Sequence, residues 1–142
     1  MHTLSKKSQY ALKALLALAG RHDSAPVQIA GLAKRERIPQ KFLELILLEL
    51  RHAGILQSRK GKGGGYALAR PAEAISVAEI IRALDGPLTQ IPESDSMCGV
   101  RALMTDVRAA TASILEKESL AGLLRRTESL QQSRKNVLVY AI

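Results

Sequence analysis

Cysteine and aromatic residues are scarce in this sequence. Cys98 is its one cysteine, which excludes a disulfide framework within the chain and a zinc site built from four cysteines of one chain. Aromatic residues make up 3% and tryptophan is absent, so the core must consist of leucine, isoleucine, valine and alanine. Hydrophobic residues still amount to 46%, and this aliphatic composition suits packed helices better than an all-β sandwich.

Long apolar runs are absent as well. The sequence has no apolar run of about 18 residues and no signal peptide, so we expect a cytoplasmic protein without a membrane span. A basic amphipathic first helix could instead lie on a membrane surface, but no other segment favours that interpretation.

Catalytic patterns are not recognisable either. No carboxylate pair, Ser/His/Asp set or cofactor loop is present, and His2, His22 and His52 have no metal-ligand spacing to Cys98. The glycine-rich segment 59–65 is not a nucleotide-binding loop, because neither a Gly-Lys-Ser/Thr sequence nor a helix follows it. We therefore expect no enzymatic activity and no metal site.

Acidic residues are scarce in the first half of the chain. The 142 residues carry a net charge of +8, with an isoelectric point of about 10.0. Residues 1–70 contain 13 basic against four acidic side chains, whereas residues 71–142 contain eight against nine. A charge excess confined to one half indicates a polyanionic partner such as double-stranded DNA.

The apolar residues recur mostly at helical spacing. They predict helices over residues 6–19, 27–35, 39–52, 76–84 and 99–117, a last short helix over 120–126, and strands over 55–58 and 66–69. Ser5, Ser76 and Ser119 stand where helix caps belong. Residues 127–136 either extend the last helix or are loose, and the apolar segment 137–142 is predicted to be strand-like and docked.

The second and third predicted helices, followed by a hairpin with a basic tip, are typical of a winged helix-turn-helix. In that motif the third helix enters the major groove of DNA and the hairpin forms the wing. Pro39 is expected to be the first residue of the third helix. Arg37 stands where the turn often has glycine, which implies strain if its φ is positive. The residues expected where the two helices cross are apolar: Leu32, Ala33, Ile38, Leu43 and Ile46.

Candidate DNA contacts follow from this arrangement. Gln40, Lys41 and Glu44 are expected to face base edges, although Glu44 could equally be an ordinary solvent-facing glutamate. The candidates for phosphate contacts beside the third helix are Lys34, Arg35 and Arg37. On the wing, the candidates are Arg59, Lys60, Lys62, Gly63, Gly64 and Tyr66, with glycines that permit positive φ and close approach to DNA.

Three segments resemble the IscR-like family of bacterial regulators, which includes IscR, NsrR and CymR. They are Leu4–Leu15, Phe42–Glu44 and the glycine-rich wing Arg59–Tyr66, and the resemblance extends from Leu4 to Leu124. It implies base contacts near Lys41 and Glu44, and wing contacts near Lys60 and Lys62. It also implies a homodimer joined through the long helix 100–117, whose apolar face comprises Val100, Leu103, Met104, Val107, Ala110, Thr111 and Ile114.

Many members of this family hold an iron–sulfur cluster through three cysteines in the loop before the long helix. Here that loop offers Cys98 alone, and Arg101 stands where some members have histidine. One thiolate cannot hold a cluster that needs four ligands, so we expect no cofactor. Cys98 is a candidate redox sensor, because a helix N-terminus stabilises a thiolate, but a lone cysteine is more often a packing residue.

These patterns together predict a mainly α fold with a small β-hairpin wing. We expect a winged helix-turn-helix domain over 1–84, a linker or effector loop over 85–98, and a dimerisation helix with a C-terminal tail over 99–142. The expected function is a sequence-specific transcriptional regulator, a repressor by preference, that binds palindromic operators as a homodimer. The alternative is a protein-interaction module with only non-specific DNA binding.

Overall fold

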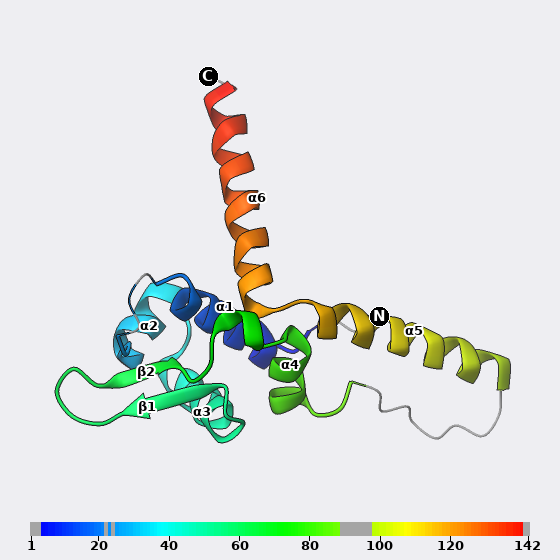
Figure 1. Cartoon of the computed structure of the whole chain (residues 1–142), viewed down its shortest axis with the longest axis horizontal. Coiled ribbons are helices and arrows are strands. Elements are labelled where there is room, and N and C mark those ends of the chain that lie inside the picture. The colour runs from blue at the N-terminus through cyan, green and yellow to red at the C-terminus, as the bar shows by residue number, and fades with distance from the viewer. Residues whose placement is uncertain (1–3, 22, 24, 89–97, 141–142) are drawn as a thin grey trace.

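The computed structural model describes residues 4–21, 23, 25–88 and 98–140, with side chains up to 137. Its helices and strands follow the chain in the order shown in Figure 1: α1 (Lys6–Ala19), α2 (Ile29–Glu36), α3 (Gln40–His52), β1 (Leu56–Arg59), β2 (Gly65–Leu68), the short 3-10 helix η1 (Ala72–Ala74), α4 (Val77–Asp85), α5 (Cys98–Lys117) and α6 (Leu120–Tyr140). The predicted fold class, mainly α with a small hairpin wing, is confirmed.

Three serines begin helices as the sequence predicts. The Ser5 hydroxyl accepts a hydrogen bond from the backbone N–H of Ser8 at 3.0 Å, which caps α1. The Ser76 hydroxyl caps α4 by accepting from the N–H of Glu79 at 3.1 Å. Ser119 caps α6 in the same way. Each hydroxyl satisfies one of the backbone donors that the first turn of a helix leaves unpaired.

The core consists of aliphatic residues from α1 to α4, together with the first turn of α6. Every residue predicted at the crossing of the second and third helices is buried: Leu32, Ala33, Ile38, Leu43 and Ile46. Leu120 of α6 is also completely buried in this core. The polar residue buried with them is Ser8, whose hydroxyl donates to the Asp85 carboxylate at 2.6 Å and so joins α1 to the end of α4.

The start of α2 differs from the prediction. The helix does not begin at Val27, because this residue pairs with Tyr66 of the hairpin through two backbone hydrogen bonds of 2.8 Å. Gln28 has extended backbone angles and stands at the helix boundary, so α2 begins at Ile29. Pro39 likewise precedes α3 with ψ near 125° and is not its first residue. The pairing between Val27 and Tyr66 fixes the hairpin against the entrance of α2.

The C-terminal prediction was partly wrong. Residues 127–136 extend the last helix, which was one of the two alternatives left open, but residues 137–140 are not a strand, because α6 continues to Tyr140. Residues 127–136 lack glycine and proline and contain several good helix formers, which is sufficient for the helix to continue. Residues 141 and 142, part of the predicted strand, lie outside the described part of the chain.

Two helical arms leave the body from a common point. Figure 1 shows α5 and α6 projecting in different directions from the compact bundle of α1–α4. Between them, Ser119 pairs with Ser76; the N–H of Val77 donates to Glu118 O at 2.8 Å and that of Leu120 to Ile75 O at 2.7 Å. The division into segments 1–84, 85–98 and 99–142 stays a prediction. Among the described residues, no helix is long and apolar enough to cross a membrane.

Candidate nucleic-acid interface

The turn between α2 and α3 places three cations beside the third helix. Arg37 has φ 56° and ψ 47°, the left-handed conformation suspected from the sequence. Its backbone N–H bonds to Ala33 O and thereby ends α2. The side chains of Lys34, Arg35 and Arg37 are all exposed. A compact turn therefore keeps these charges next to the N-terminal end of α3.

Helix α3 presents distinct faces. Leu43, Ile46, Leu47 and Leu50 are buried, while the predicted base-reading residues Gln40, Lys41 and Glu44 are exposed near its N-terminus. The Gln40 amide donates to the Glu44 carboxylate at 3.5 Å, so these two side chains lie side by side. Because they lie side by side, the two side chains could contact neighbouring base pairs in the major groove of DNA.

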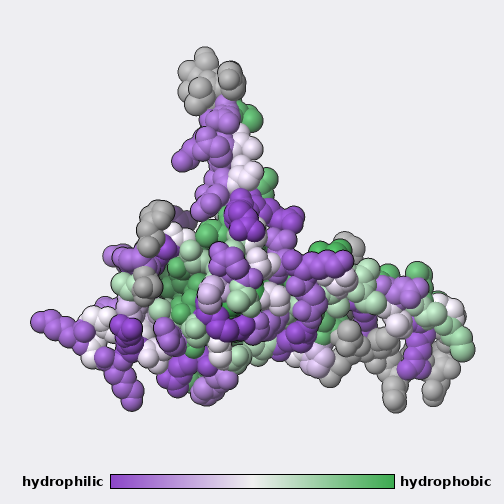
Figure 2. All heavy atoms as spheres, in the orientation of Figure 1, coloured by the Kyte–Doolittle hydropathy of each residue, from purple (hydrophilic) through white to green (hydrophobic). Residues whose placement is uncertain are grey.

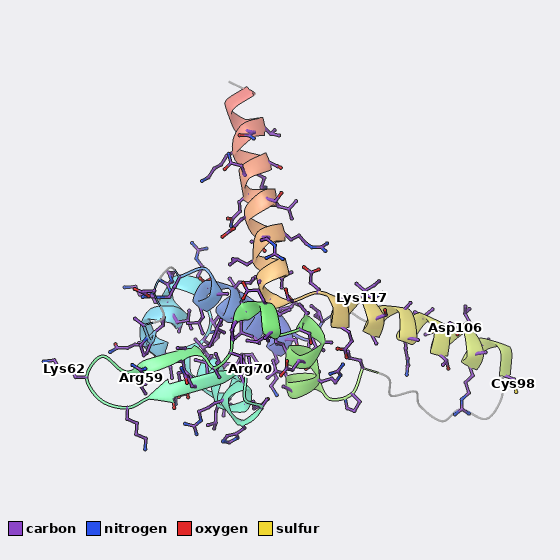
Figure 3. All side chains as sticks on the ribbon, in the orientation of Figure 1. Arg59, Lys62, Arg70, Cys98, Asp106 and Lys117 are labelled. Carbon is purple, nitrogen blue, oxygen red and sulfur yellow. The ribbon has the colours of Figure 1, made fainter. Side chains whose placement is uncertain are left out.

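The wing is a two-stranded antiparallel hairpin in which Leu56 pairs with Leu68 and Arg59 with Gly65. β1 begins one residue after its predicted start, and β2 begins one residue before its predicted start. Figure 3 shows the Lys62 side chain at the tip of the loop, with Arg59 at the end of β1 closer to the body. Arg59, Lys60 and Lys62 are exposed, so the hairpin presents its cations to solvent.

The glycines of the wing serve different purposes. Gly61 and Gly63 have positive φ of 93° and 79°, as expected for a tight tip. A Cβ at Gly64 would lie 2.2 Å from Arg59 O, and one at Gly65 would lie 2.3 Å from Val27 O. Gly64 and Gly65 are therefore required by the packing of the chain against itself, which composition alone could not distinguish from close approach to DNA.

A groove of about 300 Å³ lies between the wing and the N-terminal ends of α2 and α3. Its lining includes five of the predicted residues, Gln40, Glu44, Arg59, Gly64 and Tyr66, and the structure therefore brings these residues together. It also includes Gln28 and Ser58, which sequence reasoning missed. Gln28 was assigned to the interior of a helix, and no sequence signal indicated that a strand-like pairing at Val27 would bring it to the groove.

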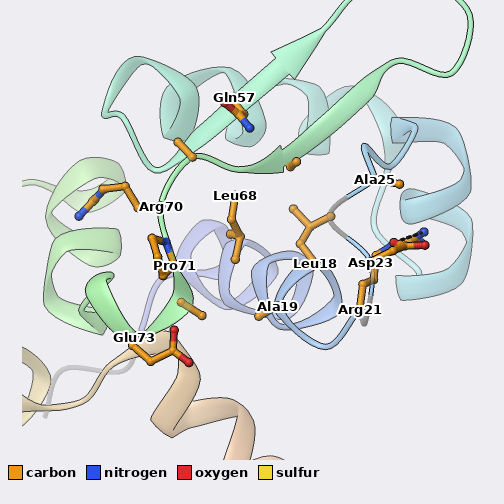
Figure 4. Close-up of a pocket in the computed structure, with 13 residues that line it drawn as sticks. Leu18, Ala19, Arg21, Asp23, Ala25, Gln57, Leu68, Arg70, Pro71 and Glu73 are labelled. Atoms are coloured by element: carbon orange, nitrogen blue, oxygen red, sulfur yellow. Dashed lines mark hydrogen bonds and ion pairs between the residues drawn. The ribbon is translucent and has the colours of Figure 1, made fainter.

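A larger hollow of about 450 Å³ lies between the C-terminal end of α1, the hairpin and η1 (Figure 4). The arginines that line it are held by their own neighbours: Arg21 pairs with Asp23 at 3.1 Å, and Arg70 bonds to Glu79 and to Ala74 O. Since its cations are already paired, this hollow is a weaker candidate for an anionic ligand than the groove beside the wing.

Cys98 is the first residue of α5 and is exposed, at the end of this helix farthest from the body (Figure 3). The described residues contain no group of three His, Cys, Asp or Glu side chains able to hold a metal ion. An iron–sulfur cluster needs four ligands, typically cysteine thiolates, and the sequence contains one cysteine. The donor set of this chain does not fit such a cluster.

Comparison with known proteins identifies the family. Residues 4–126 match the Rrf2 family, which is described as iron-dependent transcriptional regulators. An rrf2-like HTH-type regulator of Rhodobacter capsulatus is 44% identical over 92 residues, which span 63% of this chain and 61% of that protein. The HTH-type regulator CymR of Bacillus subtilis is 30% identical over 131 residues, covering 92% of this chain and 95% of CymR.

The solved structures agree with the sequence matches. The structure of CymR, the global cysteine regulator of B. subtilis, has a TM-score of 0.82 and covers 89% of this chain and 98% of its own, at 30% identity. The IscR structure of T. potens has a TM-score of 0.78 and covers 92% and 91%, at 28% identity. The winged-helix fold and the resemblance noted in the sequence are both confirmed. The chain belongs to the Rrf2 family of transcriptional regulators.

Proposed function

We propose that this regulator binds specific DNA sequences as a homodimer, with α3 in the major groove and the hairpin on neighbouring phosphates. The observation that carries the proposal is the groove between α3 and the wing, where Gln40 and Glu44 lie beside Arg59. Two exposed cations are sequence neighbours of its lining residues, Lys41 next to Gln40 on α3 and Lys62 next to Gly61 on the wing. Polar side chains that can read bases are thus accompanied by charges that can hold the DNA backbone.

The apolar face of α5 supports a second copy of the chain as its partner. Its predicted dimerisation residues are all exposed in the single chain: Val100, Leu103, Met104, Val107, Ala110, Thr111 and Ile114. Leu115, by contrast, packs against the core on the side of α5 that contacts α4. Apolar residues along the projecting α5 are visible in Figure 2. A contiguous apolar stripe of this length is typical of an interface, and self-association through it would present two recognition helices to a palindrome.

We further propose that DNA binding needs no iron–sulfur cluster, because one cysteine is an insufficient donor set. In this proposal the chain occupies its operator without a cofactor and acts as a repressor. It has no enzymatic activity. Cys98 remains a candidate redox sensor on the strength of its exposed position at a helix N-terminus. If a Cys98→Ser variant responds to peroxide and reductant as the parent protein does, the thiol has no sensing role.

Selection of bound genomic DNA fragments tests the function directly. The purified protein is used at about 150 mM salt, close to physiological ionic strength, with no iron or sulfide added. We expect a palindromic motif with half-sites about one helical turn apart, roughly 34–36 Å. Recovery of fragments without a shared motif would contradict sequence-specific binding and favour a protein-interaction module.

A further inference from the structure

Two leucines lie exposed on the outward face of α3. Leu45 is 59% exposed and Leu48 is 37% exposed. With Lys41 and His52 they are spaced at i, i+4, i+7 and i+11, so the four residues form one line along the helix. This line lies opposite the buried face that includes Leu43 and Leu47.

Contacts within the chain occupy one flank of this line, and the groove beside the wing borders the other. On one flank, Phe42 packs edge-to-face on Tyr10 with ring centroids 5.7 Å apart, and Glu49 pairs with Lys7 at 2.7 Å. On the other flank, Gln40 and Glu44 line the groove beside the wing. The outward line is therefore free of these contacts, and it lies next to the base-reading residues proposed above.

We propose that Leu45 selects thymine by packing on the C5-methyl group that this base displays in the major groove. The proposal rests on the proposed DNA-binding function. Leu45 stands in the second turn of α3, next to Glu44 and one turn after Lys41, and the N-terminal part of a recognition helix is the part that reaches base edges. The thymine methyl is an apolar group in the floor of that groove, and contact with it is a known mode of base recognition.

A protein partner fits this surface less well. Two leucines bordered by Lys41, Glu44, Arg51 and His52 offer little apolar area, whereas a stable protein interface buries about 1,000 Å² or more. The apolar stripe of α5 is better suited to such an interface, because more exposed large hydrophobic residues follow one another along it. On α3, the cations Lys41 and Arg51 beside a small apolar centre are complementary to a base methyl flanked by phosphates.

Replacing thymine with uracil removes the methyl group and nothing else. Burial of one methyl-sized group favours binding by about 0.8 kcal/mol, which corresponds to about a four-fold change in affinity. We expect this loss of affinity, about four-fold, when uracil replaces one particular thymine of a half-site. That thymine should lie within one base pair of the position whose base preference changes in a Glu44→Ala variant. Uracil in both half-sites should lower the affinity of the parent protein about fifteen-fold.

The test starts from the motif recovered by selection and measures binding to uracil-substituted duplexes. A Leu45→Ala variant should bind the thymine operator more weakly and lose its sensitivity to uracil at that position. Since Leu45 is exposed, the unfolding temperature of the Leu45→Ala variant should match that of the parent protein. Leu48→Ala is the matched control, because it shortens the next leucine of the same line and should keep the uracil response.

The outcomes separate the two proposals. Absence of any selected motif would overturn the proposed function. A motif with no uracil-sensitive thymine, or with a sensitivity that Leu45→Ala retains, would overturn the role of Leu45 while leaving sequence-specific binding intact. Loss of the uracil response in Leu45→Ala alone would establish the methyl contact.

Discussion

Arg37 combines a left-handed backbone with an exposed cation beside α3. Substitution by glycine or alanine removes the charge equally, so both variants should lose DNA affinity to the same extent. Glycine adopts the left-handed conformation freely, whereas alanine keeps the strain, so the glycine variant should have a free energy of unfolding about 1 kcal/mol higher than the alanine variant. Urea denaturation measures this difference, and equal stabilities would show that the backbone of Arg37 is not strained in solution.

Glu44 lies in the groove with Gln40 and Arg59, where a carboxylate is useful only if it meets a base donor. A Glu44→Ala variant should relax the preference at one base pair by about 1–3 kcal/mol, while non-specific binding is unchanged or slightly stronger because a negative charge has gone. Competition between the selected operator and single-base variants measures the effect. Identical discrimination by parent and variant would remove Glu44 from base recognition.

The wing is an element whose charges should act without regard to sequence. Replacing Lys60 and Lys62 with alanine should weaken binding to all duplexes and flatten the salt dependence of log K by about 0.9 for each phosphate that the variant no longer neutralises. Lys135→Ala on the projecting α6 removes a comparable exposed charge far along the chain and serves as the control. A titration of affinity against salt decides the matter, and an unaltered slope in the wing variant would exclude wing contacts with phosphates.

A glycine-to-alanine substitution should have opposite effects on stability in the wing and in a helix. Gly64→Ala would force a Cβ to 2.2 Å from Arg59 O, so we expect the wing to distort, with a cost of about 1–3 kcal/mol and reduced DNA affinity. Gly31→Ala should have the opposite effect on stability, a gain of about 0.5–1 kcal/mol, because Gly31 lies within α2 and an alanine methyl there would meet no atom within 4 Å. Urea unfolding of both variants should therefore move in opposite directions.

Local signals explain which elements could be predicted from the sequence. The caps at Ser5 and Ser76 and the apolar periodicity of α1 and α3 depend on residues close in the chain, and the bounds of these helices lie within one residue of those expected. The start of α2 was misjudged because the pairing of Val27 with Tyr66 joins segments about 40 positions apart, and periodicity carries no information about it. For the same reason Gln28 and Ser58 were missed as groove residues, while Gln40 and Glu44 were found from the helix alone.

At the scale of the whole molecule, the exposed face of α5 predicts that the oligomeric state controls DNA affinity. Leu103 and Ile114 are 61% and 69% exposed, so glutamate at both positions should leave the single chain folded but prevent dimer formation. Sedimentation should then report a monomer, and operator affinity should fall because two half-sites no longer bind together. Thr105→Glu adds a charge to an exposed residue of α5 outside that stripe and should remain dimeric. A dimer that persists in the double variant would require another interface.

The joint at residues 118–120 has an evolutionary consequence. Both arms leave the body through backbone hydrogen bonds and the buried Leu120, so the direction of α5 and α6 is set by the core that also supports α3. If α3 reads bases as proposed, a single substitution on its surface would change which bases are preferred, whereas a change of half-site separation would require rebuilding this joint and the core beneath it. After duplication of the gene, we therefore expect the base sequences recognised by the two copies to diverge long before the separation of their half-sites does.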